Sequence, residues 1–260
     1  MRWVPVSVQY WSLVMKSKRS GLLVSGIVVF SLMGTVAQAH EIWFANRAKV
    51  PALIYGLGAD DLDMVQRKSL ITKVAAFDAD MKPIKATLRP NGTVLFVDTA
   101  HRAAVLTAVM DNGKWSRRPD GEWVRQVNER LPGALASEQT LKFAMTIQAP
   151  LNTLPQVMPG PGVEVLPVTT NMPQHKDESL AVRVYFNGKP VGGAKVLPDF
   201  VNDPDAAPLL TAPDGTVTVK VRNQGLNVIA AAVDAKSEDK TIDQVEYSAT
   251  LSFTLAHKPE

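Results

Sequence analysis

Histidine is the residue type that offers this chain its most specific chemistry, since the sequence has four histidines and no cysteine. The lack of cysteine excludes disulfides, thiolate zinc sites, iron–sulfur clusters and a cysteine nucleophile. Any metal site must therefore be built from nitrogen and oxygen donors. Imidazole is a common nitrogen donor for divalent transition metals. The candidates are His40, His101, His175 and His257.

The familiar enzyme motifs are absent from the sequence. It has no G-x-S-x-G elbow, no phosphate-binding P-loop, no dinucleotide fingerprint and no H-E-x-x-H pair. We therefore expect a protein that is not an enzyme.

The first 39 residues have the layout of a secretory signal peptide. Three basic residues, Lys16, Lys18 and Arg19, precede an uncharged stretch from 21 to 39 that ends in Ala37-Gln38-Ala39. A basic segment, an apolar segment and a small-x-small site, in that order, predict cleavage after Ala39. Met15 is an alternative start that gives a more compact signal. A transmembrane anchor is the alternative interpretation, because about 20 apolar residues can span a bilayer. The small-x-small ending favours cleavage, no remaining membrane anchor, and a periplasmic protein.

Cleavage would also change the charge of the chain. The whole sequence has a formal net charge of +3, from 28 basic and 25 acidic side chains. Residues 1–39 hold four basic residues and no acidic one, so the processed chain has a net charge of −1. The remaining basic residues form no stripe with interleaved aromatic residues. We therefore expect no nucleic-acid partner.

Cleavage after Ala39 would make His40 the first residue of the processed chain. Its α-amine and its imidazole Nδ1 could then chelate one metal ion in a six-membered ring. Nitrogen donors of this kind suit late first-row divalent ions such as Ni²⁺, Co²⁺ and Cu²⁺. The alternative interpretation is that His40 merely borders a cleavage site. A bidentate chelate also needs further ligands to hold a metal tightly.

Candidate further ligands are His101, Asp60 and Asp61. His101 could supply a third nitrogen, although a histidine after Asp98-Thr99-Ala100 is also typical of a turn. Asp60 and Asp61 follow Gly56-Leu57-Gly58 and could supply oxygen ligands. The alternative is that these acids cap the N-terminus of a short helix.

Short strand-like segments separated by turn dipeptides dominate residues 40–260. The alternation in Val217–Val221 has the period of a half-buried strand. Asn-Gly and Asp-Gly pairs favour tight turns because they tolerate positive φ, and they begin at Asn91, Asn112, Asp120, Asn187 and Asp214. The segments 60–69 and 124–137 could form short helices. The expected strands are 52–56, 70–78, 93–97, 103–111, 141–147, 163–168, 180–186, 217–221, 227–233 and 247–255.

Prolines divide the chain that follows the signal. Six of them lie from Pro150 to Pro173, and such a segment cannot donate a continuous ladder of hydrogen bonds. We interpret it as an extended crossover at the end of an N-terminal β-domain, residues 40–173. Residues 174–260 have the strand count of a small β-sandwich. The predicted fold is all-β, with two antiparallel β-sandwich domains.

Several short motifs, in order along the chain, resemble those of the DUF4198 family. The resemblance extends from residue 40 to about residue 255. The motifs are His40-Glu41-Ile42-Trp43 after the signal, Leu53-Ile54-Tyr55-Gly56 before an acidic cluster, Met110–Trp115, Asp120–Trp123, Asn187–Val191, Ala194–Val196, Asp214-Gly215, Gly225–Ile229 and Ala249–Phe253.

The resemblance implies a periplasmic protein that handles nickel or cobalt for an inner-membrane metal transporter. The family is often described as the periplasmic component of nickel and cobalt uptake systems. The metal role would fall on His40, which matches the family's histidine after the signal. The second domain resembles small immunoglobulin-like or carboxypeptidase-regulatory-like modules.

Three functions are consistent with these observations. The first is metal binding through His40 for nickel or cobalt uptake. The second is a non-catalytic interaction or adhesion module, for which we expect an exposed apolar patch. The third is a copper protein with a histidine brace, which requires His101 or His175 close to His40.

Overall fold

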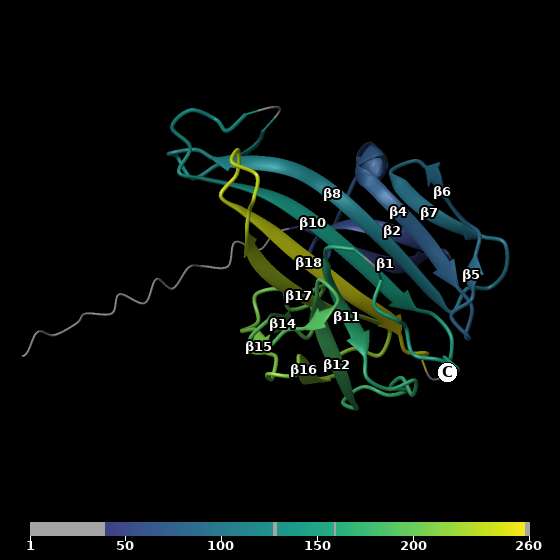
Figure 1. The fold of residues 1–260 in the computed structure, drawn as a ribbon. Coiled ribbons are helices and arrows are strands. Elements are labelled where there is room, and N and C mark those ends of the chain that lie inside the picture. The colour runs from purple at the N-terminus through teal and green to yellow at the C-terminus, as the bar shows by residue number, and fades with distance from the viewer. Residues whose placement is uncertain (1–39, 127–128, 159, 258–260) are drawn as a thin grey trace, which may run out of the picture. The chain divides into compact units, whose positions relative to one another are not determined.

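The computed structural model describes residues 40–126, 129–158 and 160–257 (Figure 1). The predicted signal peptide, residues 1–39, lies outside the described residues. The described chain is built from strands and one short 3₁₀ helix, η1 (Val65–Leu70). The predicted all-β class is therefore confirmed. No helix within the described ranges is long and apolar enough to cross a membrane.

A five-stranded sheet opens the described chain. Its order is β1-β2-β7-β6, and β3 pairs with the last residues of β2. The turn between β1 and β2 has positive φ at both central residues, 50° at Ala48 and 66° at Lys49. This is the geometry of a tight hairpin turn, made here without glycine. The strands are β1 (Glu41–Arg47), β2 (Val50–Leu57), β3 (Asp60–Leu62), β6 (Ala86–Asn91) and β7 (Val94–Thr99).

A nine-stranded sheet is the largest of the described sheets, with the order β15-β14-β17-β18-β10-β8-β4-β5 and with β9 paired to β8. β10 and β18 run parallel, from the pair Glu138–Gln244 to the pair Ile147–Phe253. The other described strand pairs are antiparallel, so the prediction of purely antiparallel sheets is wrong at β10–β18. A parallel pair needs a long crossover, and the chain from β11 to β17 supplies it. The strands are β4 (Ile71–Phe77), β5 (Pro83–Ile84), β8 (Val105–Arg117), β9 (Trp123–Arg125), β10 (Ala136–Ile147), β14 (Lys195–Leu197), β15 (Leu209–Leu210), β17 (Leu226–Lys236) and β18 (Gln244–Thr254).

A four-stranded sheet lies partly within the proline-rich segment. Its order is β11-β12-β13, and β16 pairs with β12. The strands are β11 (Val163–Pro167), β12 (Ser179–Phe186), β13 (Lys189–Pro190) and β16 (Thr216–Lys220). The predicted crossover therefore contains one ordered strand, β11, as the apolar run 163–168 indicated.

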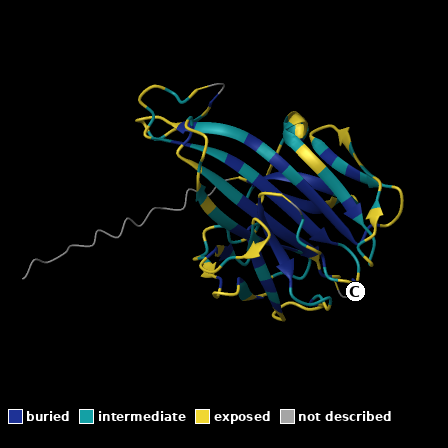
Figure 2. Cartoon of the chain, viewed as in Figure 1, coloured by how far each residue is buried: buried dark blue, intermediate teal, exposed yellow. Residues whose placement is uncertain are grey.

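Side chains of β10 contribute to apolar clusters on both faces of the nine-stranded sheet. Phe143 and Met145 pack with Val182 of β12, whereas Ala144 packs with Ile42 of β1. Because successive side chains of a strand point to opposite faces, the four-stranded sheet lies against one face and β1 against the other. Figure 2 shows that burial in β10 increases toward its C-terminal end, in agreement with its burial pattern.

Strands from both predicted domains share the nine-stranded sheet. β4, β8 and β10 precede residue 173, and β14, β15, β17 and β18 follow it. The division at 173 stays a prediction about folding units, as does the immunoglobulin-like form of residues 174–260. The long β10–β18 pair nevertheless makes one continuous sheet across that division.

The turn predicted at Asn112 was wrong, and of the two predicted short helices only the one over 60–69 was found, in part. Asn112-Gly113 lies inside β8 instead of in a turn, and the register of β8 against β10 shifts opposite Gln139 and Leu141. The positive φ of Gly113, 81°, serves this β-bulge. The segment 60–69 forms β3 and most of the 3₁₀ helix η1, and the described part of 124–137 contains no helix.

Candidate functional site

His40 is the first described residue and stands immediately before β1. Its exposed ring stacks on the ring of Tyr55 in β2, with the centroids 5.4 Å apart and 11° between the planes. The register of β1 against β2, which pairs Ile42 with Tyr55, brings these rings together. Neither ring nitrogen of His40 has a hydrogen-bond partner within the described part of the chain. The imidazole is therefore held in place while its nitrogens stay available.

Two basic side chains influence His40. The guanidinium carbon of Arg67 lies 4.3 Å from the centroid of the Tyr55 ring. The pKa of His40 is lowered mainly by partial burial, and further by the positive charges of Lys142 and Arg67. The imidazole is therefore neutral near pH 7, which is the form that binds a metal. The same two cations oppose the approach of a metal cation.

Glu41, the next residue, is buried together with Lys142 of β10. Nζ of Lys142 lies 3.7 Å from Oε1 of Glu41, and the hydroxyl of Ser248 donates a 2.6 Å hydrogen bond to Oε2. Burial raises the pKa of Glu41 to about 7, although Lys142 and Ser248 act in the opposite direction. Nζ of Lys142 has no hydrogen-bond acceptor in the described chain. The Glu41 carboxyl group therefore offsets a buried ammonium charge.

Asp60 and Asp61 do not gather around His40. At Gly56 an added Cβ would lie 1.8 Å from the Asp60 carbonyl oxygen, so only glycine fits this close approach of β3 to β2. Asp61 forms an ion pair with Arg47, the last residue of β1. The described ranges contain no group of three or more histidine, aspartate or glutamate side chains that could hold a metal ion.

Asp63, the third acid of this segment, directly precedes Met64, the N-cap residue of η1. Its carboxylate accepts a 3.0 Å hydrogen bond from the backbone N–H of Gln66, at the start of η1. Asp60 and Asp61 lie in β3 and are exposed.

His101 and His175 lie near the opposite end of β1. Each is next in sequence to a residue that lines a pocket with Asn46: Arg102 follows His101, and Gln174 precedes His175. A strand rises about 3.3 Å per residue, so the six steps from His40 to Asn46 span roughly 20 Å. The structure therefore does not bring either histidine to His40 as a further ligand.

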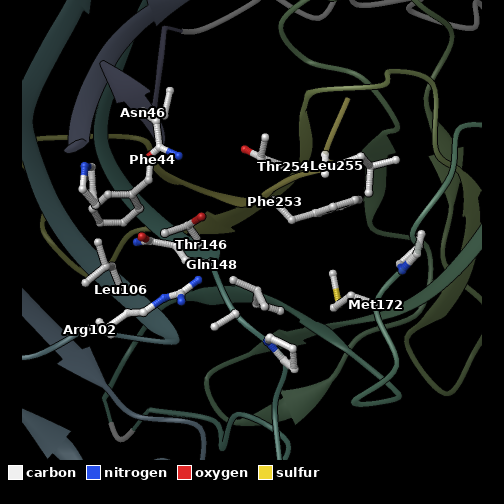
Figure 3. Close-up of a pocket in the computed structure, with 18 of the residues that line it drawn as sticks. Phe44, Asn46, Arg102, Leu106, Thr146, Gln148, Met172, Phe253, Thr254 and Leu255 are labelled. Atoms are coloured by element: carbon white, nitrogen blue, oxygen red, sulfur yellow. The ribbon is translucent and has the colours of Figure 1, made fainter. Parts of the chain in front are cut away.

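That pocket has a volume of about 740 Å³, and no sequence motif marked it. Five separate segments line it: the β1–β2 hairpin, the loop before β8, the end of β10, residues 170–174 and the end of β18. Figure 3 shows Arg102 and Gln148 on the side of Phe44 and Leu106, with Met172 and Leu255 opposite them. Since the segments meet only in the folded chain, sequence patterns alone could not have found the pocket.

The fold defines an all-β protein whose largest sheet is joined across the chain by the parallel β10–β18 pair. The chain belongs to the DUF4198 family, described as a domain of unknown function, whose model matches residues 37–235. It is also similar to an uncharacterized protein of Haemophilus influenzae, with 25% identity over 186 residues, which cover 64% of this chain and 70% of that protein. The predicted family is therefore confirmed, and the matched range includes His40.

Proposed function

We propose that the processed chain is a periplasmic metal-binding protein, not an enzyme, that assists nickel or cobalt uptake by an inner-membrane transporter. The metal would be held by the α-amine and the imidazole Nδ1 of His40. The observation that carries the proposal is the exposed His40 ring, stacked on Tyr55 at the start of β1. The resemblance of the sequence motifs to the DUF4198 family supports the same role.

The donor atoms of His40 favour weak, exchangeable metal binding. Two nitrogen atoms from one residue leave most coordination positions to water or to a partner's ligands. Lys142 and Arg67, which lower the pKa of the imidazole, also weaken the binding of a cation. An exposed metal with open coordination positions suits a protein that passes its metal to a transporter.

A non-catalytic interaction module is the alternative function. The large hydrophobic residues that are exposed in the described chain are Leu62, Leu135, Leu209 and Leu210. The last two are neighbours in the short strand β15 and offer the alternative its best surface. We infer as well that the sheets stack as β-sandwiches that share the nine-stranded sheet, because apolar clusters combine side chains of different sheets.

Titration calorimetry with Ni²⁺, Co²⁺ and Cu²⁺ tests the metal role. One chain begins at His40, and a second retains Ala39, which moves the α-amine away from the imidazole. We expect the second chain to bind at least about tenfold more weakly, a loss of about 1.4 kcal/mol. His101→Ala in the first chain is the matched control and should bind as the parent does. Equal metal affinity of the two chains would show that the α-amine of His40 is not a ligand, and would contradict the proposed site.

A further inference from the structure

The charges that line the pocket at the far end of β1 all have one sign. Lys49, in the β1–β2 turn, and Arg102, before β8, are its charged lining residues, and no carboxylate of the described residues lines it. Neither cation forms an ion pair within the described part of the chain. Two cations that face one recess without an anion create a positive potential there. The pocket is therefore electrostatically suited to a negatively charged ligand.

Gln148 adds a buried hydrogen-bond donor to the same pocket. Its Nε2 is buried and has no acceptor in the described chain, whereas its backbone N–H donates a 2.8 Å hydrogen bond to the Ala104 carbonyl. Figure 3 shows its side chain on the same side of the pocket as that of Arg102. A buried N–H without an acceptor is unfavourable, and an oxygen of a bound ligand would satisfy it.

The rest of the pocket wall combines apolar side chains with polar ones such as Asn46, Thr146 and Thr254. The lining includes apolar side chains of the buried core, among them Phe44, Ile147, Phe253 and Leu255. A bare inorganic ion would leave these apolar side chains in contact with water. Pockets of a few hundred to about 1,000 Å³ with apolar walls and a few polar groups typically hold small organic molecules.

We propose that this pocket binds a small organic carboxylate with an apolar body. The Arg102 guanidinium pairs with the carboxylate, because its planar set of N–H donors matches two carboxylate oxygens. Nε2 of Gln148 donates to one of these oxygens, and Lys49 adds positive charge at the rim. The apolar body lies against Met172, which faces Arg102 across the pocket, and against the end of β18. The pocket is distinct from His40 and goes beyond the proposed metal function.

Titration calorimetry of octanoate into the chain 40–260 tests this proposal. The variants are Arg102→Gln, which removes the proposed partner of the carboxylate, and Gln148→Glu, which replaces the buried donor by an acid of nearly the same shape. Arg118→Gln is the matched control, because Arg118 is exposed, carries the same charge and does not line the pocket. 1-Octanol and inorganic phosphate separate the contributions of the apolar body and the charge. Thermal unfolding of each variant shows whether it is folded.

We expect octanoate to bind, Arg102→Gln to weaken it about tenfold or more, and Arg118→Gln to leave it unchanged. Gln148→Glu should abolish octanoate binding if this variant folds. If it does not fold, the result for Arg102→Gln decides the test, because Arg102 is exposed. The proposal is overturned if octanoate gives no heat, if Arg102→Gln binds it as the parent does, or if 1-octanol or phosphate binds as tightly. Nickel binding at His40 is a separate measurement, so the failure of either proposal can be recognised alone.

Discussion

At the scale of single residues, Glu41 and Lys142 decide how the start of β1 is held. Glu41 is bound to Ser248 of β18 and lies beside Lys142 of β10, so the residue after His40 is anchored to the nine-stranded sheet. The processed N-terminus would therefore begin at a fixed point of the fold. The sequence analysis missed this contact, although a lysine inside the strand-like run 141–147 could have indicated it, because lysine is almost never fully buried without a partner.

Glu164 lowers the stability of the folded chain as the pH rises, whereas a carboxylate whose pKa falls on folding does the opposite. Burial in β11 raises its pKa to about 7 from an ordinary value of 4.5, although two hydrogen bonds from the Met158 N–H and the charge of Lys73 lower it. The folded chain thus holds a proton that the unfolded chain releases between pH 4.5 and 7. This contribution is fully present below pH 4.5 and is lost as the pH rises to about 7.

We expect the temperature of the unfolding midpoint to fall as the pH rises through this window. The fall should be smaller in Glu164→Gln, because this variant cannot titrate at position 164. A contribution of about 1 kcal/mol corresponds to about 2–4 °C for a chain of this size. Calorimetric scans of both chains at several values from pH 4.5 to 7.5 measure the difference in slope. Glu238→Gln, at an exposed position, serves as the control. Equal slopes for Glu164→Gln and the parent would show that Glu164 does not titrate in this way.

At the scale of strands, alternation and turn residues located most of the sheet. Each of the predicted strands overlaps an observed one, because buried strands need runs of β-branched and apolar residues whatever their partners. The pairing of β10 with β18 could not be predicted from local sequence patterns, since the paired residues are about 100 positions apart. The Asn112-Gly113 bulge was missed because positive φ serves a bulge as well as a turn.

The candidate site was predictable only in part. His40 was found because cleavage would place two nitrogen donors on one residue. Tyr55 and Lys142 reach it through tertiary contacts that leave no pattern of spacing. Asp60 and Asp61 were expected as possible ligands, but no group of three possible ligands forms among the described residues, and Asp61 is paired with Arg47.

The parallel pairing of β10 with β18 gives a direct test of the predicted division at residue 173. A fragment of residues 174–260 keeps β12 to β18 but loses β10, which pairs with β18 along ten residues. Leu251 and Phe253, buried in the core, would then be uncovered. We expect the fragment to lack a cooperative thermal transition and dispersed amide signals in NMR, while the chain 40–260 shows both. A folded fragment would establish residues 174–260 as an independent domain.

At the scale of the whole molecule, β1 connects two different chemistries. Its beginning carries the exposed imidazole of His40, and its end, with the hairpin that follows, helps to line the pocket with Lys49 and Arg102. The roughly 20 Å of strand between them keeps the two sites separate. Metal binding at one end and carboxylate binding at the other are therefore expected to be independent.

The central claim is that export itself creates the metal site at His40. Native mass spectrometry of the protein isolated from the periplasm, recorded with nickel added in excess, measures its N-terminus and its bound metal together. The expected result for the parent is a chain that begins at His40 and carries one nickel ion. The variant His40→Ala should carry no metal. A mature chain that begins at another residue, or equal metal content in His40→Ala, would contradict the claim.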